Sequence, residues 1–193
     1  MANPLILLVG QSASGKTSVA EVLESKYKLK SLRSYTTRKP RYDGEDGHVF
    51  ISNEDFDKLE DIIAYTEYNN NRYCATKEQL DASDIYVVDP HGVETLLNGY
   101  PTNRHIYIFY LNTNIRNRID RMYKRGSSDT EIVNRLYVDE EYNWFDRLKI
   151  IVWRSFRKVY LYDIDADKPI EDVVKQIMNS VVNKEVVYEG RLI

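Results

Sequence analysis

The chain has 193 residues, of which 42% are hydrophobic and 30% charged, and its net charge at pH 7 is −3. This balance is typical of one globular domain and excludes a disordered chain, while the negative charge disfavours a protein that coats nucleic acid or an anionic membrane. No apolar run approaches the roughly 20 residues that span a bilayer, and the N-terminus lacks the basic region of a signal peptide. Because Cys74 is the single cysteine, no internal disulfide is possible, and we expect a cytoplasmic protein.

A strand followed by a glycine-rich loop opens the chain. The apolar run Leu5–Val9 predicts a buried parallel strand, and Gly10–Thr17 (GQSASGKT) follows it. These residues fit the phosphate-loop pattern G-x-x-x-x-G-K-[S/T] at every fixed position. A helix over Ser18–Lys26 is predicted next from its apolar stripe. In this order, backbone N–H groups surround a polyphosphate, Lys16 reaches its β- and γ-phosphates, and the Thr17 hydroxyl binds Mg²⁺. A glycine turn without a ligand is the weaker alternative.

A basic segment, RSYTTRKPR at 33–41, comes after this helix. Pro40 prevents it from continuing as a helix. Guanidinium groups and hydroxyls together can hold a phosphate. A second phosphate site and a solvated basic loop are both consistent with this composition.

Residues 33–80 are predicted to form a small mixed module inserted between core elements. Its first parts are a strand over His48–Ile51 and a helix capped by Ser52, whose apolar side continues through Phe56 and Leu59 to Ile63. Two strands, at 64–68 and 72–76, follow on either side of an asparagine turn.

Two further core strands are predicted over Ile85–Val88 and His105–Leu111. Asp89 follows the first of them, at the sheet edge where α/β proteins bind their ligands. We expect its carboxylate to act on Mg²⁺, directly or through water, or on a substrate; a helix-capping role is the alternative. The three histidines show no metal-ligand spacing, so no histidine metal cluster is expected.

Two arginine-bearing helices are predicted over Ile115–Arg125 and Thr130–Trp144, with a polar break between them. Such a pair suits a lid that closes over phosphates, at about 121–135. The apolar positions of the first helix are Ile115, Ile119 and Met122. The cations interpreted as solvent-exposed are Arg116, Arg118 and Lys124.

The last third of the chain is less informative. Residues 148–156 are not assigned to an element, a strand is predicted over Val159–Tyr162, and a helix over Asp172–Val182. The tail at 184–193 has no recognisable role.

Taken in order, these motifs resemble the guanylate kinase family of nucleoside monophosphate kinases. The resemblance runs from Leu5 to about Met178 and depends most on residues 34–41 (SYTTRKPR), which contain the family pattern T-T-R-x-P-R. The other matching stretches are 71–73, Asp89 with Gly92–Val93, and 121–135. The resemblance implies an α/β, three-layer phosphate-loop kinase with a parallel central sheet. It also implies one domain over 1–193, with the acceptor-binding insertion at 33–80 and a helical lid at about 121–135.

The same resemblance implies transfer of a phosphoryl group from ATP to (d)GMP with Mg²⁺, giving ADP and (d)GDP. Its partners are then ATP and a nucleoside monophosphate, without nucleic acid or membrane, in a monomer or homodimer. The implied ATP-binding residues are Gly10, Ser12, Ala13, Ser14, Gly15, Lys16, Thr17 and Ser18. The implied acceptor-binding residues are Ser34, Arg38, Arg41, His48, Glu67, Tyr73, Ala75 and Asp89. The implied catalytic residues are Lys16, Arg38, Arg121, Arg135 and Asp89.

The chain departs from the family pattern where the acceptor is recognised. His48 stands where the family usually has a tyrosine, and Ala64 and Ala75 stand at the positions that read guanine. Because a site that hydrogen-bonds a base owes its selectivity to those polar groups, we hypothesise altered or relaxed base selection. Glu67 and Thr76 are nearby substitutes. The alternative acceptors are another (d)NMP or a phosphorylated sugar. A non-catalytic binding module is disfavoured, because the phosphate loop and lid arginines are retained.

Overall fold

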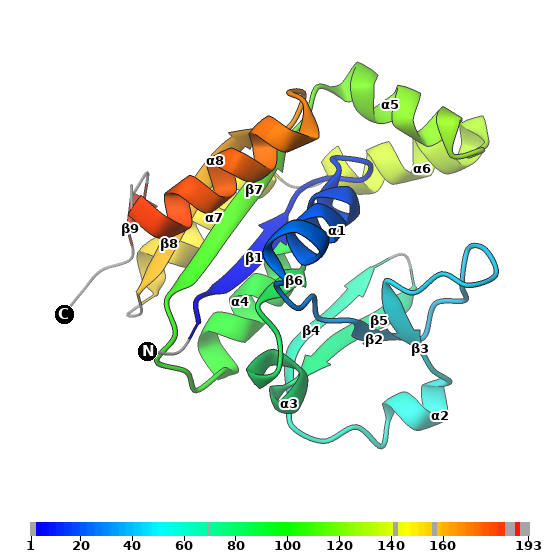
Figure 1. Cartoon of the computed structure of the whole chain (residues 1–193). Helices are drawn as coiled ribbons and strands as arrows, with labels where there is room; N and C mark the ends of the chain where they lie inside the picture. Colours follow the sequence, from blue (N-terminus) through cyan, green and yellow to red (C-terminus); the bar gives the residue numbers. More distant parts are fainter. Residues whose placement is uncertain (1–2, 69, 141–142, 156–157, 184–187, 190–193) are drawn as a thin grey trace.

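The computed structural model describes residues 3–68, 70–140, 143–155, 158–183 and 188–189, and Figure 1 shows their arrangement around a central sheet. This sheet has the strand order β6-β1-β7-β8-β9, in which the first four strands are parallel and β9 pairs antiparallel with β8. The expected α/β architecture with a parallel central sheet is confirmed. The strands are β1 (Leu5–Val9), β6 (Ile85–Val87), β7 (Ile106–Asn112), β8 (Val159–Asp165) and β9 (Tyr188–Glu189).

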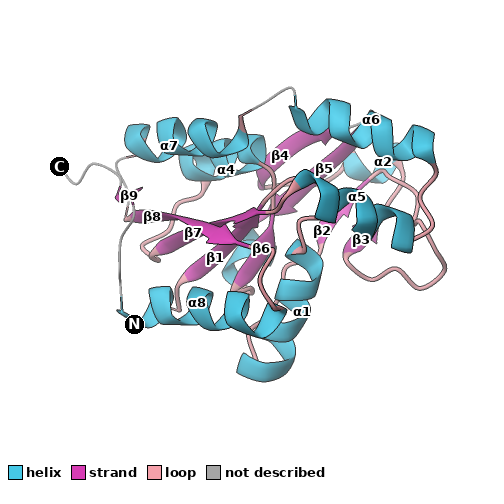
Figure 2. Ribbon diagram, turned by 90° about the horizontal axis from the view of Figure 1, so that it is seen from above, coloured by secondary structure: helices cyan, strands magenta, loops and turns pink. Residues whose placement is uncertain are grey.

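Helices cover both faces of this sheet, with α1 and α8 on one face and α4 and α7 on the other (Figure 2). The β1 strand is buried on both faces, as its uninterrupted apolar sequence predicts. Its alternate residues enter different clusters: Leu5, Leu7 and Val9 pack into one core, and Ile6 and Leu8 into the other. The covering helices are α1 (Lys16–Tyr27), α4 (Pro90–Gly99), α7 (Trp144–Arg154) and α8 (Ile170–Asn183).

A second sheet, with the strand order β3-β2-β5-β4, lies beside the first, and β4 contacts α4. Its strands are β2 (Ser34–Thr36), β3 (His48–Phe50), β4 (Ile62–Tyr68) and β5 (Asn71–Thr76), and its helices are α2 (Asn53–Phe56) and α3 (Lys77–Asp81). The strands predicted at 48–51, 64–68 and 72–76 are therefore present, with shifted ends.

The predicted helix through Ile63 is wrong beyond its first turn. Ser52 is the N-cap as expected, and its hydroxyl accepts the Asp55 N–H at 3.1 Å. However, α2 ends at Phe56, Asp61 has a left-handed φ of 51°, and Ile63 lies in β4. A non-glycine residue in this conformation interrupts a right-handed helix, so the apolar spacing at 56, 59 and 63 does not reflect one helix face.

The two predicted lid helices are α5 (Ile115–Lys124) and α6 (Asp129–Glu140), separated at Gly126, whose φ is 81°. The expectation that the second helix reaches Trp144 is wrong. Trp144 begins α7, where the Asn143 side chain accepts the Asp146 N–H. Helix α7 also includes residues 148–154, which the sequence left unassigned, and residue 156 lies outside the described residues.

The remaining expectations concern surfaces and termini. Ile115, placed on the apolar stripe of its helix, is 45% exposed. Of the tail at 184–193, only Tyr188 and Glu189 are described, as β9. In the described part of the chain, no helix has the length and apolar character needed to cross a membrane.

Candidate functional site

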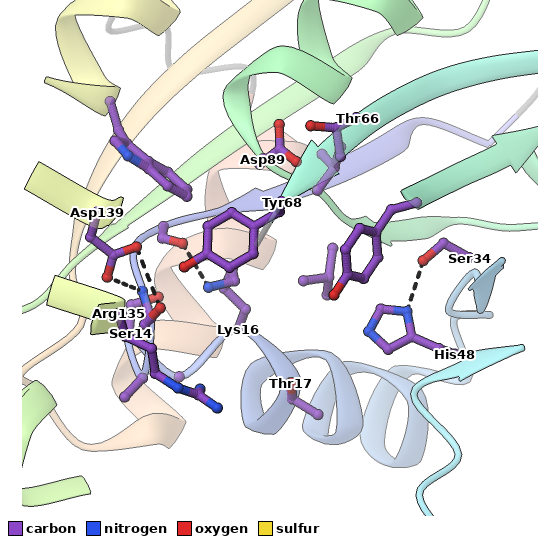
Figure 3. Close-up of a pocket in the computed structure, with 18 of the residues that line it drawn as sticks. Ser14, Lys16, Thr17, Ser34, His48, Thr66, Tyr68, Asp89, Arg135 and Asp139 are labelled. Carbon is purple, nitrogen blue, oxygen red and sulfur yellow. Dashed lines mark hydrogen bonds between the residues drawn. The ribbon is translucent and has the colours of Figure 1, made fainter. Parts of the chain in front are cut away.

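A pocket of about 220 Å³ lies at the carboxyl end of β1 and is lined by the phosphate loop, the second sheet and residues of the α5–α6 region. Figure 3 shows Lys16 and Tyr68 near its centre, Arg135 and Asp139 on one side, and Ser34 and His48 on the other. The lining residues named by the sequence are Gly10, Ser12, Ala13, Ser14, Gly15, Lys16, Thr17, Ser34, Arg41, His48, Tyr73, Asp89 and Arg135. Elements distant in sequence therefore place two groups of predicted phosphate ligands around one space.

The phosphate loop has a backbone that its sequence makes possible. Gly15 has a φ of 101°, which glycine adopts without a steric penalty, and Ala13 has a φ of 61°. A Cβ on Gly10 would lie 2.6 Å from Ser14 Oγ and 2.9 Å from the Leu111 carbonyl oxygen. Buried Ser14 Oγ has no hydrogen-bond partner among the described residues. Because Gly15 precedes α1, no side chain caps the N–H groups of its first turn, which suits binding of an anion.

Lys16 is held by the loop itself. Its Nζ donates to the carbonyl oxygens of Gly10 at 2.6 Å and Gln11 at 2.9 Å. Burial lowers the pKa of Lys16 to about 8, although the nearby Asp139 carboxylate opposes this shift. The ammonium group therefore lies at the pocket with weak carbonyl partners that an oxyanion can replace.

A second set of polar groups faces the pocket from the smaller sheet. Ser34 Oγ and His48 Nδ1 lie 2.9 Å apart, and the His48 ring packs edge-on against Tyr73 at a centroid distance of 5.7 Å. Burial, together with the Arg38 charge, lowers the pKa of His48 to about 4. The imidazole is therefore neutral at pH 7 and has both a donor and an acceptor nitrogen.

Arg38 lies behind this set rather than in the pocket lining. Its two terminal nitrogens donate to both carboxylate oxygens of Glu45, at 3.1 and 2.8 Å, and Glu45 also accepts the Arg41 N–H at 2.7 Å. Burial alone would raise the pKa of Glu45, but these hydrogen bonds and positive charges lower it to about 2. The Arg38–Glu45 pair thus fixes the loop that carries Arg41 to the pocket.

Asp89 caps a helix, as the alternative interpretation of its role predicted. Its Oδ1 accepts the N–H groups of His91 at 2.8 Å and Gly92 at 2.9 Å, so it caps α4. Asp89 also lines the pocket, as does Thr17. Within the described residues, no group of three or more His, Cys, Asp or Glu side chains could hold a metal ion alone.

Five predicted residues lie away from the pocket lining. Ser18 and Arg121 line a neighbouring pocket on the other side of the phosphate loop, and Glu67 is exposed beside Tyr65, whose hydroxyl donates to it. Arg121 donates to the carbonyl oxygen of Ala13 at 3.2 Å. The other two are Arg38, described above, and Ala75. Ala75 is fully buried in the core, where it pairs with Ala64 across β4 and β5.

Sequence reasoning missed a buried ion pair at the loop. Arg118 was interpreted as solvent-exposed, but it is 4% exposed and donates to the Asp139 carboxylate at 2.7 Å. The correct signal was its spacing: Arg118 precedes buried Met122 by four residues and so shares its helix face. The other lining residues that were not predicted are Thr66, Tyr68, Tyr86, Val87, Val88, Arg125, Asp139 and Trp144.

Several curated proteins are similar to this chain. A guanylate kinase from Syntrophus aciditrophicus is 32% identical over 144 residues, which cover 68% of each chain. One from Agrobacterium fabrum is 25% identical over 185 residues, or 89% of this chain and 81% of the relative. The crystal structure of guanylate kinase from Anaplasma phagocytophilum has a similar fold, with a TM-score of 0.56 and 18% identity, covering 95% of this chain and 87% of the other. No family model matches the sequence.

Proposed function

This chain belongs to the guanylate kinase family, and we propose that it transfers the γ-phosphoryl group of ATP to (d)GMP with Mg²⁺. The observation that carries this proposal is the composition of one pocket. It combines an intact phosphate loop with a second group of hydrogen-bonding side chains and with arginines from the α5–α6 region. A single-nucleotide hydrolase has no need for the second group.

The donor phosphates fit the loop. We place them against the N–H groups at the start of α1, with the Lys16 ammonium exchanging its two carbonyl partners for phosphate oxygens. The neighbouring pocket beside Gly15 extends along Ile170 and Val173 and is flanked by Arg121 and Lys168. Its apolar and cationic lining supports placing the nucleoside part of ATP there.

The residues near the loop also fit Mg²⁺. This ion prefers oxygen ligands and keeps several waters while it binds substrate phosphates, so a complete protein cage is unnecessary. The hydroxyl of exposed Thr17 and the Asp89 carboxylate offer such oxygens in the pocket lining. We propose that Thr17 binds the ion directly and that Asp89 acts directly or through water. When bound, Mg²⁺ supplies neutralisation of phosphate charge.

The acceptor phosphate is assigned to the opposite wall. Ser34, His48, Tyr73 and Arg41 provide hydrogen-bond donors there, and the Arg38–Glu45 pair supports Arg41 from behind. An acceptor phosphate oxygen attacks the γ-phosphorus as the bond to the ADP oxygen breaks, and ADP leaves. The protein contributes alignment and charge neutralisation, because two polyanions repel each other unless cations surround them. Arg135 supplies such charge from the pocket lining, and Arg121 supplies it from the neighbouring pocket beside Gly15.

A second candidate keeps the chemistry and changes the acceptor. Ala64 and Ala75 are 1% and 0% exposed and offer no polar atom to a base. Since hydrogen-bond reading of guanine requires polar partners for its edge, alanine at these two positions favours another (d)NMP or a phosphorylated sugar.

Formation of ADP from ATP·Mg²⁺ separates these candidates when it is measured with GMP, dGMP, AMP, CMP, UMP, dTMP, ribose 5-phosphate or no acceptor. We expect ADP formation to require an acceptor and GMP to support it. Equal rates with GMP and the other nucleotides would contradict selectivity for guanine and support the second candidate. If no ADP forms with any of these acceptors, both enzymatic proposals are contradicted and a binding module is favoured.

A further inference from the structure

The guanidinium group of Arg118 joins α5 to α6 and to the phosphate loop. It is almost fully buried, and each of its nitrogens has a different acceptor. Nε donates to the Ser12 carbonyl oxygen at 3.0 Å, Nη1 to Gln11 Oε1 at 2.5 Å, and Nη2 to Asp139 Oδ2 at 2.7 Å. One side chain of a lid helix thus holds two consecutive residues of the loop.

Asp139 completes this arrangement from α6. Its carboxylate is 1% exposed and accepts the Ser12 N–H at 2.8 Å and the Ser12 hydroxyl at 3.3 Å. Its carbonyl oxygen accepts Gln11 Nε2 at 3.2 Å. Ser12 is therefore held at its N–H by one lid helix and at its carbonyl by the other, and Figure 3 shows the bonds to Asp139.

The fixed residues adjoin the strained part of the loop. Ala13, directly after Ser12, has a φ of 61°, a left-handed conformation that is unfavourable for a non-glycine residue. Such a conformation persists when the surroundings determine it. The Arg118–Asp139 pair fixes the backbone of Ser12, the residue before Ala13. Arg121 donates a hydrogen bond to the carbonyl oxygen of Ala13 itself. The residues that follow, Ser14 to Thr17, line the pocket.

The charge of Asp139 also needs an explanation, because a carboxylate lining a pocket for polyanions repels them. Arg118 neutralises it at contact distance, so the pair adds little net charge. Burying two charges costs several kcal/mol, and apolar pairs of similar volume often stabilise a protein equally well. An apolar pair could not, however, bind the N–H and carbonyl groups of Ser12. The polar pair therefore makes hydrogen bonds to the loop that apolar packing cannot make.

We propose that Arg118 and Asp139 are positioning residues for phosphoryl transfer, which lock Gln11 and Ser12 to the two lid helices and thereby hold the loop in its phosphate-binding shape. The pair also couples lid position to loop shape. This inference rests on the proposed function of the pocket as an ATP site. Neither residue is placed in contact with the reacting atoms.

Arg118→Lys is the primary test, because lysine can keep the ion pair with Asp139 but cannot make all three bonds. Arg116→Lys is the matched control: it makes the same exchange at an exposed position of the same helix. ATP affinity is measured by titration calorimetry with ATP·Mg²⁺, kcat and KM by ADP formation, and stability by thermal unfolding. We expect ATP affinity and kcat to fall about 10–100-fold in R118K, with acceptor KM within about twofold of wild type. R116K should match wild type. Unchanged ATP affinity and kcat in R118K would overturn the proposal.

A charge swap, Arg118→Asp with Asp139→Arg, separates loop positioning from ion pairing. It can restore the ion pair, but it presents acceptors and donors to the wrong atoms of Ser12. We expect ATP affinity to remain at least about tenfold below wild type even where Tm recovers. Recovery of ATP affinity in parallel with Tm would reduce the pair to a structural role. If the swap does not fold, R118K decides alone. Because calorimetry needs no acceptor, a wild-type protein that binds ATP without turnover would contradict the proposed function and still test the positioning role.

Discussion

Replacing Lys16 by methionine should separate activity from stability. Lys16→Met preserves most of the side-chain length and removes the charge beside the transferred phosphoryl group. Two unit charges about 4 Å apart interact by about 4 kcal/mol at an effective dielectric constant near 20. A loss of that size corresponds to about a 10³-fold lower kcat.

The same change should not weaken the fold. Burial lowers the pKa of Lys16 from 10.5 to about 8. A lysine whose folded pKa lies below its unfolded value disfavours folding while it is protonated. This penalty is complete below about pH 8 and disappears as the pH rises to 10.5. At pH 7, K16M should therefore be as stable as wild type or more stable, by up to about 3 kcal/mol.

The assays are ADP formation with GMP as acceptor and urea unfolding at pH 7. Lys26→Met is the control, since Lys26 is an exposed lysine in the last turn of the same helix. We expect K26M to match wild type in both assays. A K16M variant within tenfold of wild-type kcat would refute the charge argument. A variant destabilised by more than about 1 kcal/mol would refute the burial argument.

Three further changes probe the loop and its surroundings. Gly10→Ala places a methyl group 2.9 Å from the Leu111 carbonyl, so urea unfolding should show a loss of about 1–3 kcal/mol and calorimetry a weaker ATP affinity; wild-type values would contradict the steric argument. The pKa of Glu45 is about 2 instead of 4.5, so its carboxylate stabilises the fold above pH 4.5 and this stabilisation is lost as the pH falls towards 2. Urea unfolding of wild type should therefore show a pH-dependent loss of at most about 3 kcal/mol over this range, which Glu45→Gln should not show. The same pH dependence of stability in wild type and Glu45→Gln would contradict this role of Glu45. Asp89→Asn keeps a good N-cap, so stability should change by less than about 1 kcal/mol while kcat falls about 10–100-fold; an unchanged kcat would remove Asp89 from the mechanism.

The parts of the fold that sequence could predict are those determined by local pattern. The continuous apolar run at 5–9 and the phosphate loop after it define β1 and the start of α1. The start of α5 is equally local, because the Asn114 side chain accepts the Arg116 N–H at 2.9 Å. Each of these depends on neighbours within one turn or strand, so no tertiary information was needed.

The errors arose where tertiary contacts decide. Trp144 continued an apparent helical pattern but begins α7, which packs on the sheet. Arg118 looked like a solvated cation because its partners, Ser12 and Asp139, are 106 and 21 residues away. The sequence could name two segments that line the pocket, but not the buried pair that connects one of them to α5 and α6.

The fate of the γ-phosphoryl group of ATP is the most direct test of the central claim. ³¹P NMR of the protein with ATP·Mg²⁺ and an equimolar nucleoside monophosphate follows that group without a coupling enzyme. With GMP, we predict that the γ-signal of ATP disappears while signals of GDP and ADP grow in equal amounts. Growth of inorganic phosphate with the GMP signal unchanged, or an unchanged ATP signal with every nucleoside monophosphate, would contradict a nucleoside monophosphate kinase.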